Sequence, residues 1–312
     1  MNKIFINQYS IKSPLLSNKQ RMAFISDIHG DEMKLELIID ILKKLQVSVI
    51  LLGGDLIDSN KDNNKNDKIK ELLQELSKTI NIFASIGNHD MIYFDKNLRA
   101  KNREVESREP EFWKNLNSIN GTNLHISSLP IDNPTITKWT LNNDIDIFAL
   151  NLPIEYYWRK ELSIEFYNYL EIIKSISINA EKFNILLCHS PKNIIKDGKV
   201  SDYLDYLKKF NLILSGHMHG GLVPRCIRNQ SFGRGFVGPY ASILPSHAYG
   251  IVKTDNTISL TTGGVTKIAS SSEIGFLTNN NLVAKLVDFV YPPELEILNL
   301  SPGEVTTLKK VR

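Results

Sequence analysis

Six short apolar runs recur along the chain, and each one stops where small or polar residues begin. The runs are three to six residues long and rich in β-branched side chains, which favours buried strands over helices. Between several of them the apolar positions follow a helical period, and residues 33–45 place five apolar side chains on one face. Strands that alternate with helices predict an α/β fold with a buried sheet. The runs are residues 22–25, 49–52, 82–86, 145–150, 185–188 and 212–214.

The last third of the chain has a different pattern. Residues 220–249 are rich in glycine and proline and show no helical period. Beyond them, apolar and polar residues alternate at 250–253, 257–261 and 295–300, which is the period of a strand. We expect these segments to form antiparallel strands of a second sheet that packs on the first.

Two polar stretches interrupt the apolar segments. Ser59–Lys68 is rich in Asn, Lys and Asp and is expected to be a loop. Asp95–Glu109 carries alternating charges, which are typical of a loop or an exposed helix. Apolar segments resume directly after each stretch, so we expect neither to be a domain linker. The sequence predicts one domain over residues 1–312.

Five of the six apolar runs are followed by clusters of potential ligands. In open α/β sheets ligands bind at the carboxyl ends of the strands, which is where these clusters are expected to lie. The clusters are Asp27-Ile28-His29, Gly54-Asp55-Leu56-Ile57-Asp58, Gly87-Asn88-His89-Asp90, His189 and Gly216-His217-Met218-His219-Gly220-Gly221.

The residue types in the clusters indicate metal chemistry. Imidazole combined with carboxylate suits manganese, iron, zinc or cobalt, whereas cages of oxygen alone suit calcium or magnesium. The clusters hold enough ligands for two ions with an open position on each. Two ions about 3.5–4 Å apart bind and polarise a phosphate and lower the pKa of a water between them. The sequence therefore predicts a phosphoesterase with two divalent ions, with manganese favoured.

Each cluster alone is a weak signal. An Asp-x-His is commonly a helix cap beside a surface histidine, and Gly-Asp or Gly-Asn is most often a turn. His-x-His is more specific, because alternate residues of an extended segment point the same way. Together the clusters take up five of the seven histidines and leave His125 and His247. Their joint occurrence, in order and each after an apolar run, favours the functional interpretation.

The five clusters resemble the motifs of the calcineurin-like metallophosphoesterase superfamily, D-x-H, G-D-x-x-D, G-N-H-[DE], H and G-H-x-H, over residues 22–221. The resemblance implies a β-sandwich flanked by helices. It also implies that His89 protonates the leaving oxygen and that Asp58 orients His89. The implied metal ligands are Asp27, His29 and His219 for the first ion, Asp55 as the bridge, and Asn88, His189 and His217 for the second ion.

Within the superfamily, the sequence is similar to the branch that includes bacterial phosphoesterases of the YkuE type and UDP-diacylglucosamine pyrophosphatases. The similarity rests on Gly220-Gly221 and on the tail Pro292–Ile297. Members of this branch often have an N-terminal membrane anchor, which we do not expect here. Protein Ser/Thr phosphatases continue the second motif with Arg-Gly, where this chain has Ser59-Asn60. This difference disfavours a protein-phosphatase function.

Composition narrows the class of protein and its location. The 37 basic and 34 acidic residues nearly balance, so nucleic-acid binding is not indicated. Two cysteines exclude a disulfide-dense scaffold and favour a reducing compartment. The apolar run at residues 4–6 is shorter than the roughly 7–15 residues of a signal-peptide core, and no stretch reaches the ~18 apolar residues of a membrane span. We expect a cytoplasmic protein.

Two alternatives to a phosphoesterase stay open: a non-catalytic metal-binding scaffold on the same fold, and a redox metalloprotein. The first is disfavoured because every motif position is filled, and the second because the clusters contain neither tyrosine nor cysteine. The expected substrate is a small-molecule or lipid-linked phosphate ester, and the oligomeric state is not readable. Substrate contacts are sought among basic and aromatic residues of the expected loops: Arg99, Lys101, Arg103, Trp113, Arg225, Arg234, Phe236 and Tyr240.

Overall fold

The structure is a computed structural model that describes most of the chain. Asp58 and Asp95–Glu109 lie outside the described residues. The described residues are 4–57, 63–91, 123–130, 133–153, 157, 171–191, 195–196, 199–200, 204–230, 233–238, 242–243, 245, 247–254, 257–266, 290–304 and 306–311.

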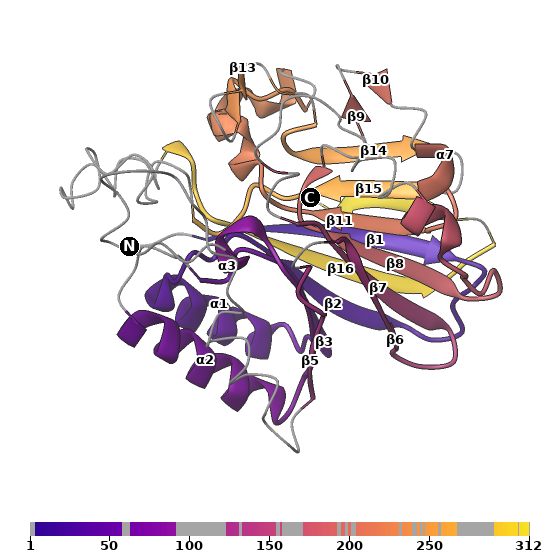
Figure 1. Ribbon diagram of the computed structural model, residues 1–312, viewed down its shortest axis with the longest axis horizontal. Coiled ribbons are helices and arrows are strands. Elements are labelled where there is room, and N and C mark those ends of the chain that lie inside the picture. Colours follow the sequence, from indigo (N-terminus) through magenta and orange to yellow (C-terminus); the bar gives the residue numbers. More distant parts are fainter. Residues whose placement is uncertain are drawn as a thin grey trace.

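Two sheets form the centre of the molecule (Figure 1). In the described residues the larger sheet has seven strands, in the spatial order β17-β1-β16-β2-β3-β4-β5. From β2 to β5 the neighbouring strands run parallel, and β16 pairs antiparallel with β2 and parallel with β1. Their bounds are β1 Phe5–Ser13, β2 Gln20–Ile25, β3 Val49–Gly53, β4 Asn81–Ser85, β5 Leu124–Ile126, β16 Glu294–Pro302 and β17 Thr307–Val311.

The smaller sheet has six strands in the described residues, in the order β14-β15-β11-β8-β7-β6. Its central strands β15, β11, β8 and β7 run parallel, and β14 and β6 lie antiparallel at the two edges. The bounds are β6 Thr135–Thr140, β7 Ile145–Asn151, β8 Phe183–Cys188, β11 Leu212–Ser215, β14 Gly250–Thr254 and β15 Thr257–Thr261. Two short pairs lie outside both sheets: β9 (Ile195–Lys196) with β10 (Lys199–Val200), and β12 (Val237–Gly238) with β13 (Ser242–Ile243).

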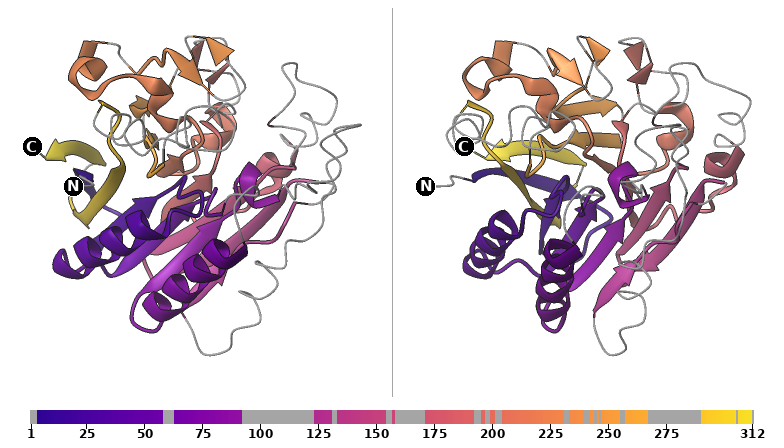
Figure 2. Two further views of the ribbon diagram at one scale, coloured as in Figure 1. Left: turned by 90° about the vertical axis from the view of Figure 1, so that its left-hand side faces the viewer. Right: turned by 60° about the vertical axis from the view of Figure 1, so that its left-hand side comes forward.

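Helices α1 (Glu32–Lys44) and α2 (Asn63–Ser77) cover the outer face of the larger sheet (Figure 2). The α1 helix begins where the Asp31 carboxylate accepts a hydrogen bond from the backbone N–H of Lys34 (3.1 Å), which satisfies an open N-terminal donor. The shorter helices of the described residues are α3 (Asn88–Met91), α7 (Leu204–Leu207) and the 3₁₀ segments η3 (His219–Leu222) and η4 (Arg225–Gln230). Among the described helices, none has the length and apolar character that crossing a bilayer requires.

The alternation of side chains along the strands explains the layers. In β2, Ala23 and Ile25 pack against the helices, whereas Met22 and Phe24 point into the space between the sheets. In the smaller sheet, Ile185 faces the same inner core and Leu186 faces an outer cluster. Because strands in the middle of such a stack are covered on both faces, they are apolar throughout. The predicted α/β sandwich with flanking helices is confirmed.

The predicted elements are confirmed at all six apolar runs, at 33–45 and at the three C-terminal strand segments. Three details are wrong. The C-terminal strands are antiparallel only in part, because β15 pairs parallel with β11 and β16 pairs parallel with β1. Residues 295–300 belong to the larger sheet, where β16 separates β1 from β2, because this strand is apolar on both faces and needs a covered position. The loop expected at Ser59–Lys68 is helical from Asn63 onward, because this polar stretch continues into the amphipathic part of α2, which Ile69 and Leu73 anchor to the core.

Candidate metal centre

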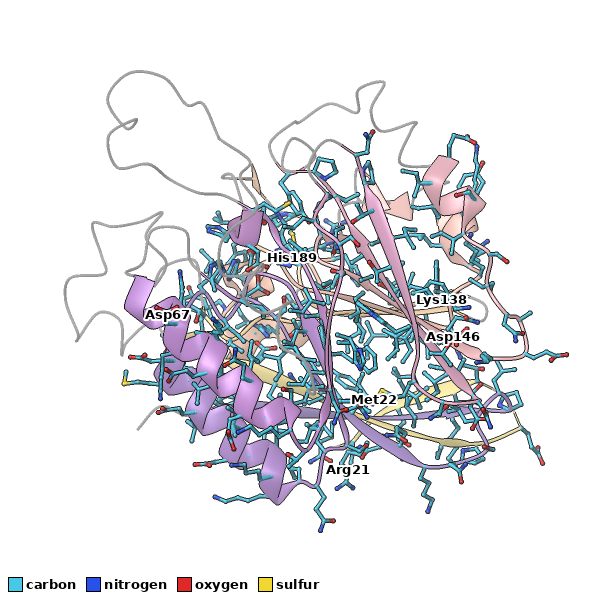
Figure 3. The ribbon with its side chains drawn as sticks, turned by 60° about the horizontal axis from the view of Figure 1, so that its bottom comes forward. Arg21, Met22, Asp67, Lys138, Asp146 and His189 are labelled. Carbon is cyan, nitrogen blue, oxygen red and sulfur yellow. The ribbon has the colours of Figure 1, made fainter. Side chains whose placement is uncertain are left out.

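The five polar clusters meet at one edge of the sandwich. Each follows the carboxyl end of a strand, which is β2, β3 or β4 in the larger sheet and β8 or β11 in the smaller one. His189 lies at this end of the molecule, and Arg21, near the start of β2, lies at the opposite end (Figure 3). Eight of the predicted site residues are at most 5% exposed: Asp27, His29, Asp55, Asn88, His89, His189, His217 and His219.

The backbone at this edge adopts conformations that residues other than glycine rarely take. Five of the eight described non-glycine residues with positive φ belong to the clusters, with φ between 48° and 66°. Each such conformation costs about 1–3 kcal/mol, and residues of this kind concentrate at functional sites. The strain therefore marks this edge as the functional part of the molecule. The five residues are Asp27, His29, Asp55, His217 and His219.

One group of ligand atoms is formed by Asp27, His29 and His219, whose nitrogen and oxygen atoms lie within 4.8 Å of one another. His219 Nε2 is 3.6 Å from Asp27 Oδ1, and the rings of His29 and His219 stack with centroids 5.2 Å apart. His219 Nδ1 lies 2.7 Å from the carbonyl oxygen of Thr266, so Nδ1–H is the donor and Nε2 is left to face Asp27. Sequence reasoning missed Thr266, because only the fold brings it to the site.

A second group is formed by Asp55, His189 and His217, again within 4.8 Å. Asp55 Oδ2 lies 3.1 Å from His189 Nε2 and 3.7 Å from His29 Nε2, so this oxygen stands between the two groups. Neither Asp55 Oδ2 nor His189 Nε2 has an aligned hydrogen-bond partner among the described residues. His189 Nδ1 donates to the carbonyl oxygen of Gly53 (2.6 Å), which directs Nε2 toward Asp55.

The Asp90 carboxylate holds the loops after β3 and β4 together. Its oxygens accept hydrogen bonds from the backbone N–H groups of Asp55 (2.8 Å), Leu56 (2.9 Å), Ile57 (3.2 Å) and Gly87 (2.8 Å). A Cβ at Gly87 would overlap the carboxylate and backbone nitrogen of Asp55, so this close approach requires glycine. Asp90 is thus a positioning residue for Asp55. The third cluster contains it, but the sequence alone assigned it no role.

Two further residues support the site, one at the end of β7 and one in the segment after it. The Asn151 side chain accepts from the backbone N–H of Ile86 (3.0 Å) and donates to Ser127 Oγ (2.7 Å), which ties the smaller sheet to the end of β4. The buried ring of Tyr157 meets His217 edge-on, with centroids 5.2 Å apart, and lies 5.9 Å from the ring of His189. Neither residue carries a sequence signal, since nothing around them forms a recognisable motif.

His89, the predicted proton donor, lies within the same cluster. Its ring is 4.7 Å from the ring of His29, and its backbone N–H donates to Asp55 Oδ1 (2.8 Å). Asn88, predicted as a ligand of the second ion, is buried at the start of α3. Asp58, predicted to orient His89, lies outside the described residues.

The electrostatics favour positive charge between the two groups. Burial opposes the charged form of Asp55, but the charges of His189 and His89 hold the pKa of this carboxyl well below its usual range. Burial also opposes a charged His189, yet the neighbouring Asp55 carboxylate raises the pKa of the imidazole to about 9. Burial and the charge of Asp55 raise the pKa of Asp90 to about 7. The negative charge of Asp55 that favours a protonated His189 would likewise favour a metal cation between the two groups.

The remaining residues considered for function lie apart from these groups or have ordinary surroundings. His125 stacks on Phe83 in β4, with ring centroids 4.7 Å apart, and His247 is buried with Nε2 3.3 Å from Ser259 Oγ. Arg234 and Phe236 are exposed. The side chains of the other six proposed substrate contacts lie outside the described part of the structure: Arg99, Lys101, Arg103, Trp113, Arg225 and Tyr240.

The donor set fits divalent transition-metal ions. Buried imidazole and carboxylate atoms converge in these two groups and in a third one between them, formed by His29, Asp55 and His89. The facing atoms of Asp55 and His189 lack aligned hydrogen bonds among the described residues. Carbonyl oxygens fix the ring orientations of His189 and His219, as is usual behind metal-binding imidazoles. Nitrogen and oxygen ligands together suit manganese, iron, zinc or cobalt.

Comparison with known proteins agrees with this chemistry. The family model for calcineurin-like phosphoesterases matches residues 20–221. An uncharacterized metallophosphoesterase of Bacillus subtilis strain 168, YkoQ, is 25% identical over 226 residues, which cover 72% of this chain and 68% of that protein. A putative metallophosphoesterase of Caenorhabditis elegans is 26% identical over 215 residues, which cover 66% of this chain and 37% of the relative.

Solved structures with a similar arrangement have low sequence identity. The Thermus thermophilus protein TT1561 is 12% identical, with a TM-score of 0.45 over 79% of this chain and 90% of the other. A dimetal phosphatase from Danio rerio is 13% identical, with a TM-score of 0.42 over 78% of this chain and 87% of the other.

Proposed function

Because the chain belongs to the calcineurin-like phosphoesterase family and is thus a hydrolase of phosphate esters, we propose that it works with two divalent ions. Asp27, His29 and His219 would hold the first ion, and the second would be held by Asn88, His189 and His217, with Asp55 shared between them. The observation that carries the proposal is the position of Asp55 Oδ2, 3.1 Å from His189 Nε2 and 3.7 Å from His29 Nε2.

Two ions bound there would polarise the phosphate and lower the pKa of the attacking water. The protein would supply the proton for the leaving oxygen from His89, whose ring lies 4.7 Å from that of His29. The assignment of Asp58 as the residue that orients His89 stays a prediction. Asp90 would keep the Asp55 loop in place through its four backbone hydrogen bonds.

The proposed ions are manganese first, then iron, zinc or cobalt, because the ligands mix imidazole and carboxylate. For the substrate we propose a phosphodiester or pyrophosphate, as a small molecule or linked to a lipid. A monoester carries an additional charge, and sites that select monoesters usually add cationic side chains. The five clusters contain no arginine or lysine, and the nearby Arg228 is paired with Glu294.

We further propose that residues 1–312 act as one domain. The cytoplasmic location stays a prediction from the cysteine content.

Hydrolysis of p-nitrophenyl phosphate and of its bis-ester tests the proposal. The protein is stripped with a chelator and assayed with Mn²⁺, Zn²⁺, Co²⁺, Fe²⁺ or no metal. Turnover is expected only with added metal, with a higher kcat/KM for the diester. A tenfold preference for the monoester would overturn the substrate proposal alone. Metal binding without turnover of either ester or of a nucleoside-diphosphate conjugate would favour the non-catalytic scaffold.

A further inference from the structure

Two sequence features have no part in the chemistry above: the double glycine Gly220-Gly221 and the tail at Glu294–Glu296. In the structure they meet behind the first group of ligands. The Arg228 guanidinium, from η4, forms an ion pair with the Glu294 carboxylate at the start of β16. The guanidinium also donates from Nε to the carbonyl oxygen of Val223 (3.1 Å) and lies 4.8 Å from the centre of the Tyr249 ring.

The ion pair touches the chain on both sides of the first ligand group. On one side, the guanidinium lies on Gly220, directly after His219, and a Cβ at Gly220 would overlap it. Gly220 also has a positive φ of 70°, so glycine is favoured there for two reasons. The backbone is thereby free to turn immediately after His219 and pass beneath Arg228.

On the other side, Glu294 reaches the segment that supports Asp27. Its backbone N–H donates to the carbonyl oxygen of Gly264 (3.0 Å), and its carboxylate lies against Gly263. Gly264 in turn packs against the Asp27 side chain, since a Cβ there would be 2.9 Å from Asp27 Cβ. The same segment ends at Thr266, whose carbonyl oxygen accepts from His219.

Buried neighbours keep the charge of this pair balanced. Glu296, two residues further along β16, lies on the same face and is 1% exposed. Asn7 Nδ2 donates to both carboxylates, at 3.4 Å to Glu294 and 3.2 Å to Glu296, and Thr262 Oγ1 donates to Glu296 (2.9 Å). Burial and the charge of Glu294 raise the pKa of Glu296 to about 7. The proton that Glu296 keeps more readily than an ordinary glutamate limits the negative charge beside the Arg228–Glu294 pair.

We propose that the Arg228–Glu294 ion pair sets the separation of Asp27 and His219, and thereby the affinity of the first metal ion. Both are positioning residues, because they act through Gly220, Gly263 and Gly264 on the ligands. The inference rests on the proposed two-ion function. By this proposal, the double glycine and the C-terminal strand both help to position the ligands of the first ion, although they are separated by more than 70 residues of sequence.

Mn²⁺ binding to chelator-treated protein, followed by calorimetry and by elemental analysis, tests the inference. Arg228→Met and Glu294→Gln are expected to weaken one of two Mn²⁺ sites by about 10–100-fold, the usual effect of losing a residue that orients metal ligands. Turnover should recover when Mn²⁺ is raised, and the exchange R228E with E294R should restore part of the affinity. Arg21→Met is the matched control, since Arg21 also binds β16, through Asn299 (2.9 Å), but at the far end of the sheet.

The outcomes distinguish the role of the ion pair from the proposed two-ion function. Wild-type protein that binds two ions, with Arg228→Met binding both as tightly, would overturn the role of the ion pair. An equal loss at both sites that is matched by Arg21→Met would also overturn it, because general destabilisation would then explain the effect. Wild-type protein that binds no Mn²⁺ would contradict the proposed function itself.

Discussion

Asp55 Oδ2 and His189 Nε2 lie 3.1 Å apart although Asp55 follows β3 of the larger sheet and His189 follows β8 of the smaller one. The candidate centre thus spans the junction of the two sheets. A ligand held by both residues would bind the folded sandwich and would have no comparable site in the unfolded chain. Metal binding should therefore stabilise the whole fold.

The first prediction is a rise in melting temperature when Mn²⁺ is added to chelator-treated protein. At a free concentration 100 times the Kd, each site contributes about 2.7 kcal/mol, which corresponds to several degrees for a chain of this size. Differential scanning calorimetry measures the shift, and excess chelator should reverse it. Asp40→Asn changes an exposed carboxylate of α1, and its melting temperature should rise with Mn²⁺ by as much as that of the wild type. No rise at saturating Mn²⁺ would contradict a site shared by the two sheets.

The second prediction concerns His89. His89→Asn should reduce turnover of esters with poor leaving groups by about 10²–10⁴-fold, because proton donation contributes that much. p-Nitrophenol needs little protonation, so the loss with p-nitrophenyl esters should be smaller. Steady-state kinetics on a series of leaving groups measures the difference, with Mn²⁺ binding as the control for intact ligands. Equal losses across the series would instead indicate that His89 positions the substrate.

The third prediction concerns Tyr157. Its ring packs on His217 and His189, so Tyr157→Phe should keep Mn²⁺ affinity close to that of the wild type. Tyr157→Leu removes the aromatic ring that packs against both imidazoles, and should weaken one Mn²⁺ site by about tenfold. Calorimetric titration compares the two variants. If both bind Mn²⁺ equally well, the ring contact has no role in holding the ligands.

The fourth prediction is a pH-dependent effect at Glu296. Its pKa is raised from 4.5 to about 7, so the folded state keeps a proton that the unfolded state loses. The contribution of this group to stability is complete below pH 4.5 and is lost as the pH rises to about 7. Glu296→Gln does not titrate and should avoid that loss. Between pH 4.5 and 8 its free energy of unfolding should therefore rise relative to that of the wild type by on the order of 3 kcal/mol.

Denaturant unfolding at pH 5 and pH 8 checks the effect at Glu296. Glu181→Gln is the control, because Glu181 is exposed and should give the same small difference at both pH values. A Glu296→Gln variant whose advantage over the wild type is equal at pH 5 and pH 8 would show that the carboxyl does not titrate in this range.

Sequence patterns predicted the elements whose periodicity is strong and the ligands that follow them. The buried strands of the two sheets are apolar on both faces, and the clusters at their ends repeat a recognisable order. The strands β1 and β17 were not predicted, because β1 pairs with β16 and β17, both nearly 300 residues away in the sequence. Nor did the sequence indicate that β16 joins the first sheet.

The supporting residues of the site could not be predicted for a similar reason. Asn151, Tyr157 and Thr266 act through contacts with residues far away in the sequence, and none belongs to a short motif. Asp90 stands inside a motif, but its role depends on four backbone N–H groups that only the fold brings to its carboxylate. In this chain, short sequence motifs identify the candidate ligands, whereas the residues that orient those ligands are brought to them only by the tertiary fold.

The central claim is that Asp55 joins two metal ions into one catalytic centre, and the metal content of Asp55→Asn measured together with its turnover tests it most directly. Elemental analysis of Mn²⁺-reconstituted wild-type protein should give two equivalents of metal per chain. Asp55→Asn should hold clearly less metal and nearly lose turnover of bis-p-nitrophenyl phosphate, while Asp40→Asn retains both. Two full equivalents with normal turnover in Asp55→Asn would contradict the account.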